Sequence, residues 1–428
     1  MIEVLYKTMK QFFPSFNNWL NRIDDPRQHG YIKYSFGEIS WIGILLFLLK
    51  IGSRRQINFQ FNTEAFRDNL AMLSKARVTK VAHDGTINYL LAKIKPEQWG
   101  RLIVKMIKRL IRMRCLEKYR MFGHYLVAVD GSGLLTFKKR HCPHCLTKEK
   151  GGKILYYYHN VLEAKLVVAG GMAFSIATEF IENPDDKVKT QDCEPAAFHR
   201  LAKKLKGYFP QLKICLLLDA LYANKRVFNL CRENKWKYLI TFKKGSMPAT
   251  YQEYLSLKKI NPDSSGEHNR EGLIQSYRWV NEIDYESDKL NVLECEEIKN
   301  EKTTKFVWLT NFGVDKTNFI TLAKGGRLRW KIENEGFNMQ KNGGYNLQHA
   351  YSEHPLALKN YYLLLQIAHI INQLMEKGSL IRSEIKKVFG SIRNIARLLL
   401  EQLRTSTFTE NELKMFNSSR FQIRLADP

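Results

Sequence analysis

Two stretches decide the fold of this chain: YLVAVD at residues 125–130 and ICLLLD at residues 214–219. Each is a short apolar run, typical of a buried strand, that ends in an aspartate. An ionised carboxylate beside a sheet core is costly unless it is paired or bound to a cation. A single strand-terminal Asp is often only a turn cap. Two of them, Asp130 and Asp219, indicate a functional site.

The sequence around these runs predicts an α/β unit with a mixed sheet, because further strands alternate with helices. Apolar runs predict strands, and amphipathic stretches predict helices. The strands are expected at 154–161, 166–177, 238–242 and 306–311, and the helices at 195–205, 224–233 and 322–341. The polar stretch 247–305, which has short alternating pieces, predicts a β-rich insertion.

Helices are expected on both sides of this unit. Residues 1–120 have helical periodicity, and 355–403 are helical in pattern throughout. The most apolar window, Ile39–Ile51, has 13 residues. A bilayer span needs about 20, so this window predicts a buried helix and no membrane contact. Ser35 and Glu38 have the spacing of a capping box at its start.

The charge balance predicts a polyanionic partner. The chain has 428 residues with 68 Lys and Arg against 42 Asp and Glu, which gives a net charge of +26. Such an excess favours nucleic acid over an anionic membrane. Seven scattered cysteines and the absence of an export signal at the first residues predict a cytoplasmic, nucleoid-associated protein.

Phosphoryl transfer on nucleic acid needs divalent cations held by hard oxygen ligands. Two aspartates therefore require at least one more acid. The stretch RLRWKIENEGFNMQK at 327–341 supplies Glu333, with Glu335 as its rival. On an α-helix, residues two apart face about 200° away from each other, so only one of the two can point at the aspartates. Glu333 is favoured because Arg329 lies one turn before it.

The motif RWKIE at 329–333, followed by Phe337 and Lys341, resembles the Arg-Trp-x-Ile-Glu-x-x-Phe helix of DDE transposases from bacterial insertion sequences. YLVAVDGS at 125–132 and LLLDALYA at 216–223 resemble the two strand aspartates of that family. KTQDCE at 189–194 and KNGGYNLQH at 341–349 are also similar to it. The likeness covers roughly residues 125–350.

The resemblance assigns roles by position. It implies that Asp130, Asp219 and Glu333 are the catalytic acids and that they bind Mg²⁺, with Mn²⁺ as a substitute. It implies DNA contacts for Arg329 and for Lys341. The chain departs from the family in two places: Gly326 stands where a Tyr is usual, and Lys341 comes eight residues after the Glu instead of seven.

A β-rich insertion of related transposases carries a Trp that stacks on a flipped base. Trp279 is the candidate for that DNA-binding role here. Packing between strands is the favoured alternative, because base stacking needs an exposed ring.

The resemblance implies an RNase H-like catalytic domain with a mixed sheet, flanked by all-helical regions. Five segments are expected: a helical DNA-binding region at 1–120, the first part of the core at 121–246, the β-rich insertion at 247–305, the last strand and helix of the core at 306–350, and a helical C-terminal region at 351–428. The implied function is a transposase that nicks transposon ends and joins their 3′-hydroxyls to target DNA. A homodimer on double-stranded DNA follows, because two ends must be held together.

Two alternatives remain: an RNase H-like nuclease without strand transfer, and a non-catalytic DNA-binding descendant of a transposase.

A separate feature is RHCPHC at 140–145, which places Cys142 and Cys145 at zinc-knuckle spacing. Residues that would complete a zinc site are His141, His144, His159 and Cys193. Because a second CxxC or a spaced His pair is missing, reduced loop cysteines are favoured over a structural Zn²⁺.

Overall fold

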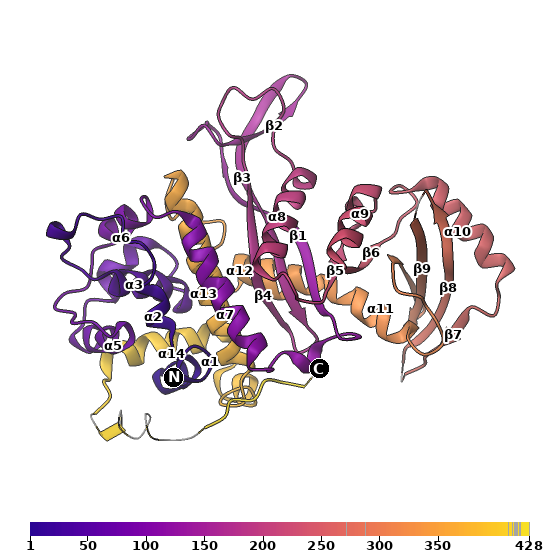
Figure 1. The fold of residues 1–428 in the computed structure, drawn as a ribbon. Coiled ribbons are helices and arrows are strands. Elements are labelled where there is room, and N and C mark those ends of the chain that lie inside the picture. The colour runs from indigo at the N-terminus through magenta and orange to yellow at the C-terminus, as the bar shows by residue number, and fades with distance from the viewer. Residues whose placement is uncertain are drawn as a thin grey trace.

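A ten-stranded mixed sheet forms the centre of the computed structural model, which describes residues 1–270, 272–286, 288–409, 411, 412, 414, 418 and 421–427. The order of the strands is β2-β3-β1-β5-β6-β10-β9-β8-β7, and β4 also pairs with β3 (Figure 1). The strands are β1 (Tyr125–Phe137), β2 (Leu146–Lys150), β3 (Lys153–Val168), β4 (Met172–Ile181), β5 (Ile214–Leu218), β6 (Lys237–Thr241), β7 (Ser265–Glu267), β8 (Ile274–Tyr285), β9 (Asp288–Lys299) and β10 (Lys302–Thr310).

The two strands with the terminal aspartates are neighbours in this sheet. β1 and β5 run parallel and in register from Tyr125 opposite Ile214 to Ala128 opposite Leu217. β5 also pairs in parallel with β6, whereas β3 is antiparallel to β1 and to β4. Asp130 and Asp219 each lie two residues beyond the last β1–β5 pair. The register therefore carries both carboxylates to the same edge of the sheet.

Helices cover the sheet and extend to one side of it (Figure 1). The chain begins with a helical region that packs on the long helix α13, and α13 in turn contacts β4. The helices are α1 (Ile2–Phe12), α2 (Phe16–Leu20), α3 (Phe36–Leu48), α4 (Ile57–Gln60), α5 (Glu64–Ser74), α6 (Asp84–Leu91), α7 (Pro96–Arg112), α8 (Glu194–Tyr208), α9 (Lys225–Asn234), α10 (Pro248–Ile260), α11 (Phe319–Arg327), α12 (Met339–Asn342), α13 (Pro355–Lys377) and α14 (Ile392–Thr405).

The helix α3 is the buried helix that the apolar window predicted. Every residue from Gly37 to Leu48 is buried. The Ser35 hydroxyl accepts a hydrogen bond of 3.1 Å from the Glu38 amide, which confirms the expected cap at its start. In the part of the chain that the structure describes, no helix has both the length and the apolar character needed to cross a membrane.

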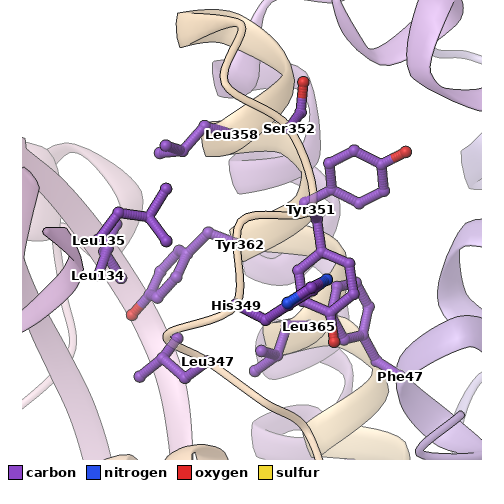
Figure 2. A pocket seen from close by; sticks show the side chains of 11 residues that line it. Phe47, Leu134, Leu135, Leu347, His349, Tyr351, Ser352, Leu358, Tyr362 and Leu365 are labelled. Carbon is purple, nitrogen blue, oxygen red and sulfur yellow. The ribbon is translucent and has the colours of Figure 1, made fainter. Parts of the chain in front are cut away.

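Polar contacts fasten α13 to the sheet. Lys165 of β3 is fully buried, lies 3.4 Å from the Glu163 carboxylate and donates a 2.7 Å hydrogen bond to Gln366 of α13. Figure 2 shows the neighbouring junction, where the segment 347–352 packs between α13 and the β1 residues Leu134 and Leu135. The cavity left there is only ≈ 20 Å³, room for about one water molecule. The helical region and the sheet are therefore packed tightly against each other.

Three sequence predictions need correction. The strand expected at 166–177 is the end of β3, a turn at Gly170 and Gly171, and the start of β4. The segment 247–305 begins with the helix α10 before its strands, and those strands continue the central sheet. The helix expected at 322–341 is broken into α11, a 3-10 turn, a π-helix and α12. The end of the segment 351–428 lies partly outside the described residues.

The cap at Ser35 yields a stability prediction. Ser35→Ala removes the acceptor for the Glu38 amide and should lower the free energy of unfolding by about 1 kcal/mol. Urea denaturation measures the change. Ser53→Ala is the matched control, because Ser53 precedes a 3-10 turn and makes no capping bond with its side chain. Equal losses in the two variants would show that the cap contributes nothing specific.

Candidate functional site

The candidate site lies where β1 and β5 stop pairing. Asp130 is at the point where β1 leaves β5 and continues along β3 opposite Glu163. Asp219 directly follows β5 and precedes a 3-10 turn at Ala220–Tyr222. The buried apolar residues before each aspartate hold its strand in the sheet. Because the pairing of β1 with β5 ends two residues earlier, each carboxylate lies at the end of the paired strands.

Arg329 connects Asp130 to Glu333. Its Nη1 atom lies 3.7 Å from the Asp130 carboxylate and 3.0 Å from the Glu333 carboxylate. The Arg329 side chain is 12% exposed, whereas that of Glu333 is 50% exposed. The guanidinium therefore occupies the place of a cation shared by two acids, and Glu333 keeps an open face toward solvent.

Glu335 faces elsewhere. Its carboxylate accepts a 2.5 Å hydrogen bond from Lys331, and its other oxygen is buried. The oxygen that accepts this bond, Oε1, lies near the β3–β4 turn, because a Cβ added at Gly171 would be 3.7 Å from it. Of the two rival acids, Glu333 is the one that shares Arg329 with Asp130.

Glu333 lies in a π-helix, Ile332–Asn338. A π-helix closes its hydrogen bonds over one more residue than an α-helix and is frequent at functional sites. One extra residue in this turn shifts every later residue by one position around the helix. Lys341, eight residues after Glu333, therefore faces the direction that the seventh residue would face in an α-helix. Gln340 is fully buried and bonds to Gln366, while Lys341 stays half-buried.

Glu194 is a fourth acid at this site. A Cβ added at Gly131 would lie 2.5 Å from the Glu194 carboxylate, so a larger residue there would require this carboxylate to move. The Tyr222 hydroxyl donates a 2.7 Å hydrogen bond to Glu194. Burial raises the pKa of Tyr222, and the carboxylates of Glu194, Asp130 and Asp219 raise it further. Sequence reasoning missed Glu194, although KTQDCE, which ends at this residue, was a signal for it.

The electrostatics at Asp130 favour a bound cation. Burial raises the pKa of Asp130 from 3.8 to about 6; Arg329 opposes this rise, and Glu333 and Glu194 add to it. A carboxylate in this position is destabilised when ionised and gains from a nearby positive charge.

The three acids are not packed tightly. Among the residues that the structure describes, the carboxylate oxygens of Asp130, Asp219 and Glu333 do not all lie within 4.8 Å of one another. Asp130, Asp219 and Glu333 therefore do not form a ready-made site for a single ion in this structure.

A basic cleft of ≈ 700 Å³ opens beside Asp219. Its lining contains one acid, Asp219, and six cationic residues: Lys243, Lys244, Lys305, Arg327, Arg329 and Lys331. Trp330, which is 54% exposed, also lines the cleft. Four of the six cations are ion-paired with carboxylates, so Lys243 and Lys244 contribute most of the unbalanced positive charge of the cleft.

Trp279, the candidate for base stacking, is a core residue. It is 5% exposed and stacks on Phe319 with ring centroids 5.4 Å apart. Its assignment as a DNA-binding residue is therefore replaced by the packing role. Trp330 is the exposed indole at the cleft.

The pair Cys142 and Cys145 belongs to a second cluster. Together with His141 and His159 it gathers four ligand atoms within 4.8 Å of one another, and this cluster could bind a metal ion. Both cysteines are free, as expected, and lie buried in the loop between β1 and β2. His144 instead lies 2.9 Å from the Asn183 carbonyl oxygen, and Cys193 is exposed.

No protein-family model matches the chain, and no curated protein matches it.

The raised pKa of Asp130 yields a pH-dependent prediction. The folded pKa of about 6 lies above the ordinary 3.8, so ionisation opposes folding above pH 6 and has no effect below pH 4. Without magnesium, Asp130→Asn should raise the free energy of unfolding at pH 8 by on the order of 2 kcal/mol and leave it unchanged at pH 4. Urea denaturation at the two pH values measures this.

The exposed Asp263 provides the control, because Asp263→Asn should change stability equally at both pH values. A loss of stability in Asp130→Asn at pH 8 would contradict the account of a desolvated carboxylate.

Proposed function

We propose that the chain is a DDE-type transposase with an RNase H-like core, which nicks DNA at transposon ends and joins the 3′-hydroxyls to target DNA. One observation carries the proposal. Asp130 and Asp219 stand at equivalent positions past two paired parallel strands, and Arg329 links Asp130 to Glu333 on the late helical segment.

The strand arrangement supports the RNase H-like core. Leaving aside the short β2, the core strands in chain order are β1, β3, β4, β5 and β6. The acids then come from the first strand, from the end of the fourth and from a late helix. This is the order that the resemblance to DDE transposases implies.

The ligand chemistry fits magnesium. Asp130, Asp219 and Glu333 offer only carboxylate oxygens, which Mg²⁺ and its substitute Mn²⁺ prefer. When bound, a pair of such ions supplies an activated oxygen nucleophile and stabilises the leaving oxygen. Arg329 holds Glu333 in orientation and is close enough to the acids to contact a phosphate of the DNA.

The basic cleft would bind the DNA backbone. Lys243 and Lys244 are exposed at the cleft, and Trp330 offers an aromatic face next to them. Lys341 and the basic helical regions would add phosphate contacts. The partner is double-stranded DNA, and the working form is a homodimer that holds two ends in a nucleoid-associated complex.

Substitution of the acids tests the reaction. Asp130→Asn, Asp219→Asn and Glu333→Gln should each lower Mg²⁺-dependent nicking of the DNA flanking this gene by about a thousandfold, equivalent to ~4 kcal/mol. The matched control is Glu335→Gln, which removes an equal charge two residues from Glu333 and should keep most of the activity. Full activity in Glu333→Gln would eliminate it as the third acid.

The products separate transposase from nuclease. With a pre-cut end that carries a 3′-hydroxyl, a transposase forms a joined product in target DNA, whereas a nuclease without strand transfer only cuts. Neither product would form if the chain were a non-catalytic DNA-binding protein.

The cleft lysines test the mode of DNA binding. Binding of duplex DNA should weaken with salt, because each phosphate contact releases counterions. In Lys243→Ala/Lys244→Ala the slope of log Kd against log salt should fall by about 2. Lys299→Ala/Lys302→Ala, on the exposed β9–β10 turn, should leave the slope unchanged. Equal effects of the two double variants would exclude the cleft as the specific DNA path.

A further inference from the structure

The His/Cys cluster lies at the base of an arm that the carboxylate site does not use. The arm consists of residues 138–158, which form the β1–β2 connection, β2, the turn after it and the first six residues of β3. It extends beyond the rest of the molecule (Figure 1). His141, Cys142 and Cys145 come from the connection, and His159 comes from β3, opposite Leu135 of β1. The cluster thus joins the connection to the main sheet.

The distances in the cluster are those of a tetrahedral site. With Zn–S of about 2.3 Å and Zn–N of about 2.0 Å, a regular tetrahedron has S···S edges of about 3.8 Å and S···N edges of about 3.5 Å. The Cys142 and Cys145 sulfurs are 3.6 Å apart. His159 Nε2 lies 3.4 Å and 3.5 Å from the two sulfurs, and His141 Nδ1 lies 3.7 Å from Cys145.

Backbone groups hold the loop that carries the cysteines. The backbone amides of His144 and Cys145 hydrogen-bond to the Cys142 sulfur. The Asn183 side chain donates a 2.9 Å bond to the Cys145 carbonyl oxygen, which fixes the loop.

We propose that His141, Cys142, Cys145 and His159 bind one structural Zn²⁺ that braces the arm. Two sulfur and two nitrogen ligands in a closed tetrahedral set are the donor set of a structural zinc site and leave no open position for catalysis. Without the ion, two buried thiols and two imidazoles would have mainly one another as partners. The ion replaces these weak contacts with four metal–ligand bonds.

The arm itself is strongly basic. Its exposed cationic residues are Lys138, Lys139, Arg140, Lys148, Lys150 and Lys153, against the single acid Glu149. Ile154, Leu155 and Tyr156 are exposed beside them. This surface fits the phosphates of DNA, an assignment that rests on the proposed function. The zinc site does not depend on it.

Metal analysis of the full-length chain, purified under reducing conditions, tests the site. The wild-type chain should carry one zinc ion, and Cys142→Ser/Cys145→Ser should carry none above background. Cys193→Ser is the matched control, since Cys193 is exposed and outside the cluster, and it should retain the ion. His159→Cys should also retain it, because a thiolate replaces the imidazole, whereas His159→Ala should lose it.

Replacement of zinc by Co²⁺ gives a reading that does not depend on folding of the variants. The wild-type chain should show the thiolate-to-cobalt absorption of a tetrahedral site. The proposal would be overturned if the wild-type chain bound neither zinc nor cobalt. It would also be overturned if the double cysteine variant kept the metal.

Trypsin tests the bracing role. Removal of zinc should speed cleavage within 138–153 by about tenfold or more, because local opening exposes the chain. An unchanged rate would contradict the bracing. These measurements need no DNA or catalysis, so their failure would leave the transposase proposal untouched, and failure of DNA nicking would leave the zinc site standing.

Discussion

The parallel, in-register pairing of β1 with β5 is the constraint on which the site depends. It places Asp130 and Asp219, 89 residues apart in sequence, at matching positions past the ends of adjacent strands. A shift of one residue in this register would turn one of the two carboxylates to the other face of the sheet. The buried apolar residues before each aspartate prevent such a shift. The rest of the sheet, including the strands of the insertion, extends outward from this pair.

A cost in electrostatic free energy accompanies this arrangement. Asp130 is partly desolvated and has further acids around it, and the buried face of the sheet cannot stabilise its charge. Arg329 offsets part of the cost by contacting both Asp130 and Glu333. The cleft beside Asp219 adds more cationic groups. The site therefore combines acids that repel one another with basic groups that partly neutralise them.

Some of this could be predicted from the sequence, and some could not. Local signals were sufficient for α3, whose apolar run and Ser35 cap are both confirmed. The turn at Gly170 and Gly171 was missed because apolar residues continue on both sides of it. The π-helix around Glu333 has no pattern of its own, so an α-helix was expected. Glu194, at the start of α8, and the choice of His141 and His159 beside the cysteines depend on tertiary contacts, which residue spacing does not reveal.

A crystal structure with Mn²⁺, located by its anomalous scattering, would show whether these carboxylates bind divalent cations. We expect manganese in contact with the carboxylates of Asp130 and Asp219, with Glu333 turned toward the ion and the contact between Arg329 and Asp130 broken. A structure in which Arg329 still contacts Asp130 and no ion lies beside either aspartate, at Mn²⁺ concentrations that saturate other magnesium enzymes, would contradict this expectation.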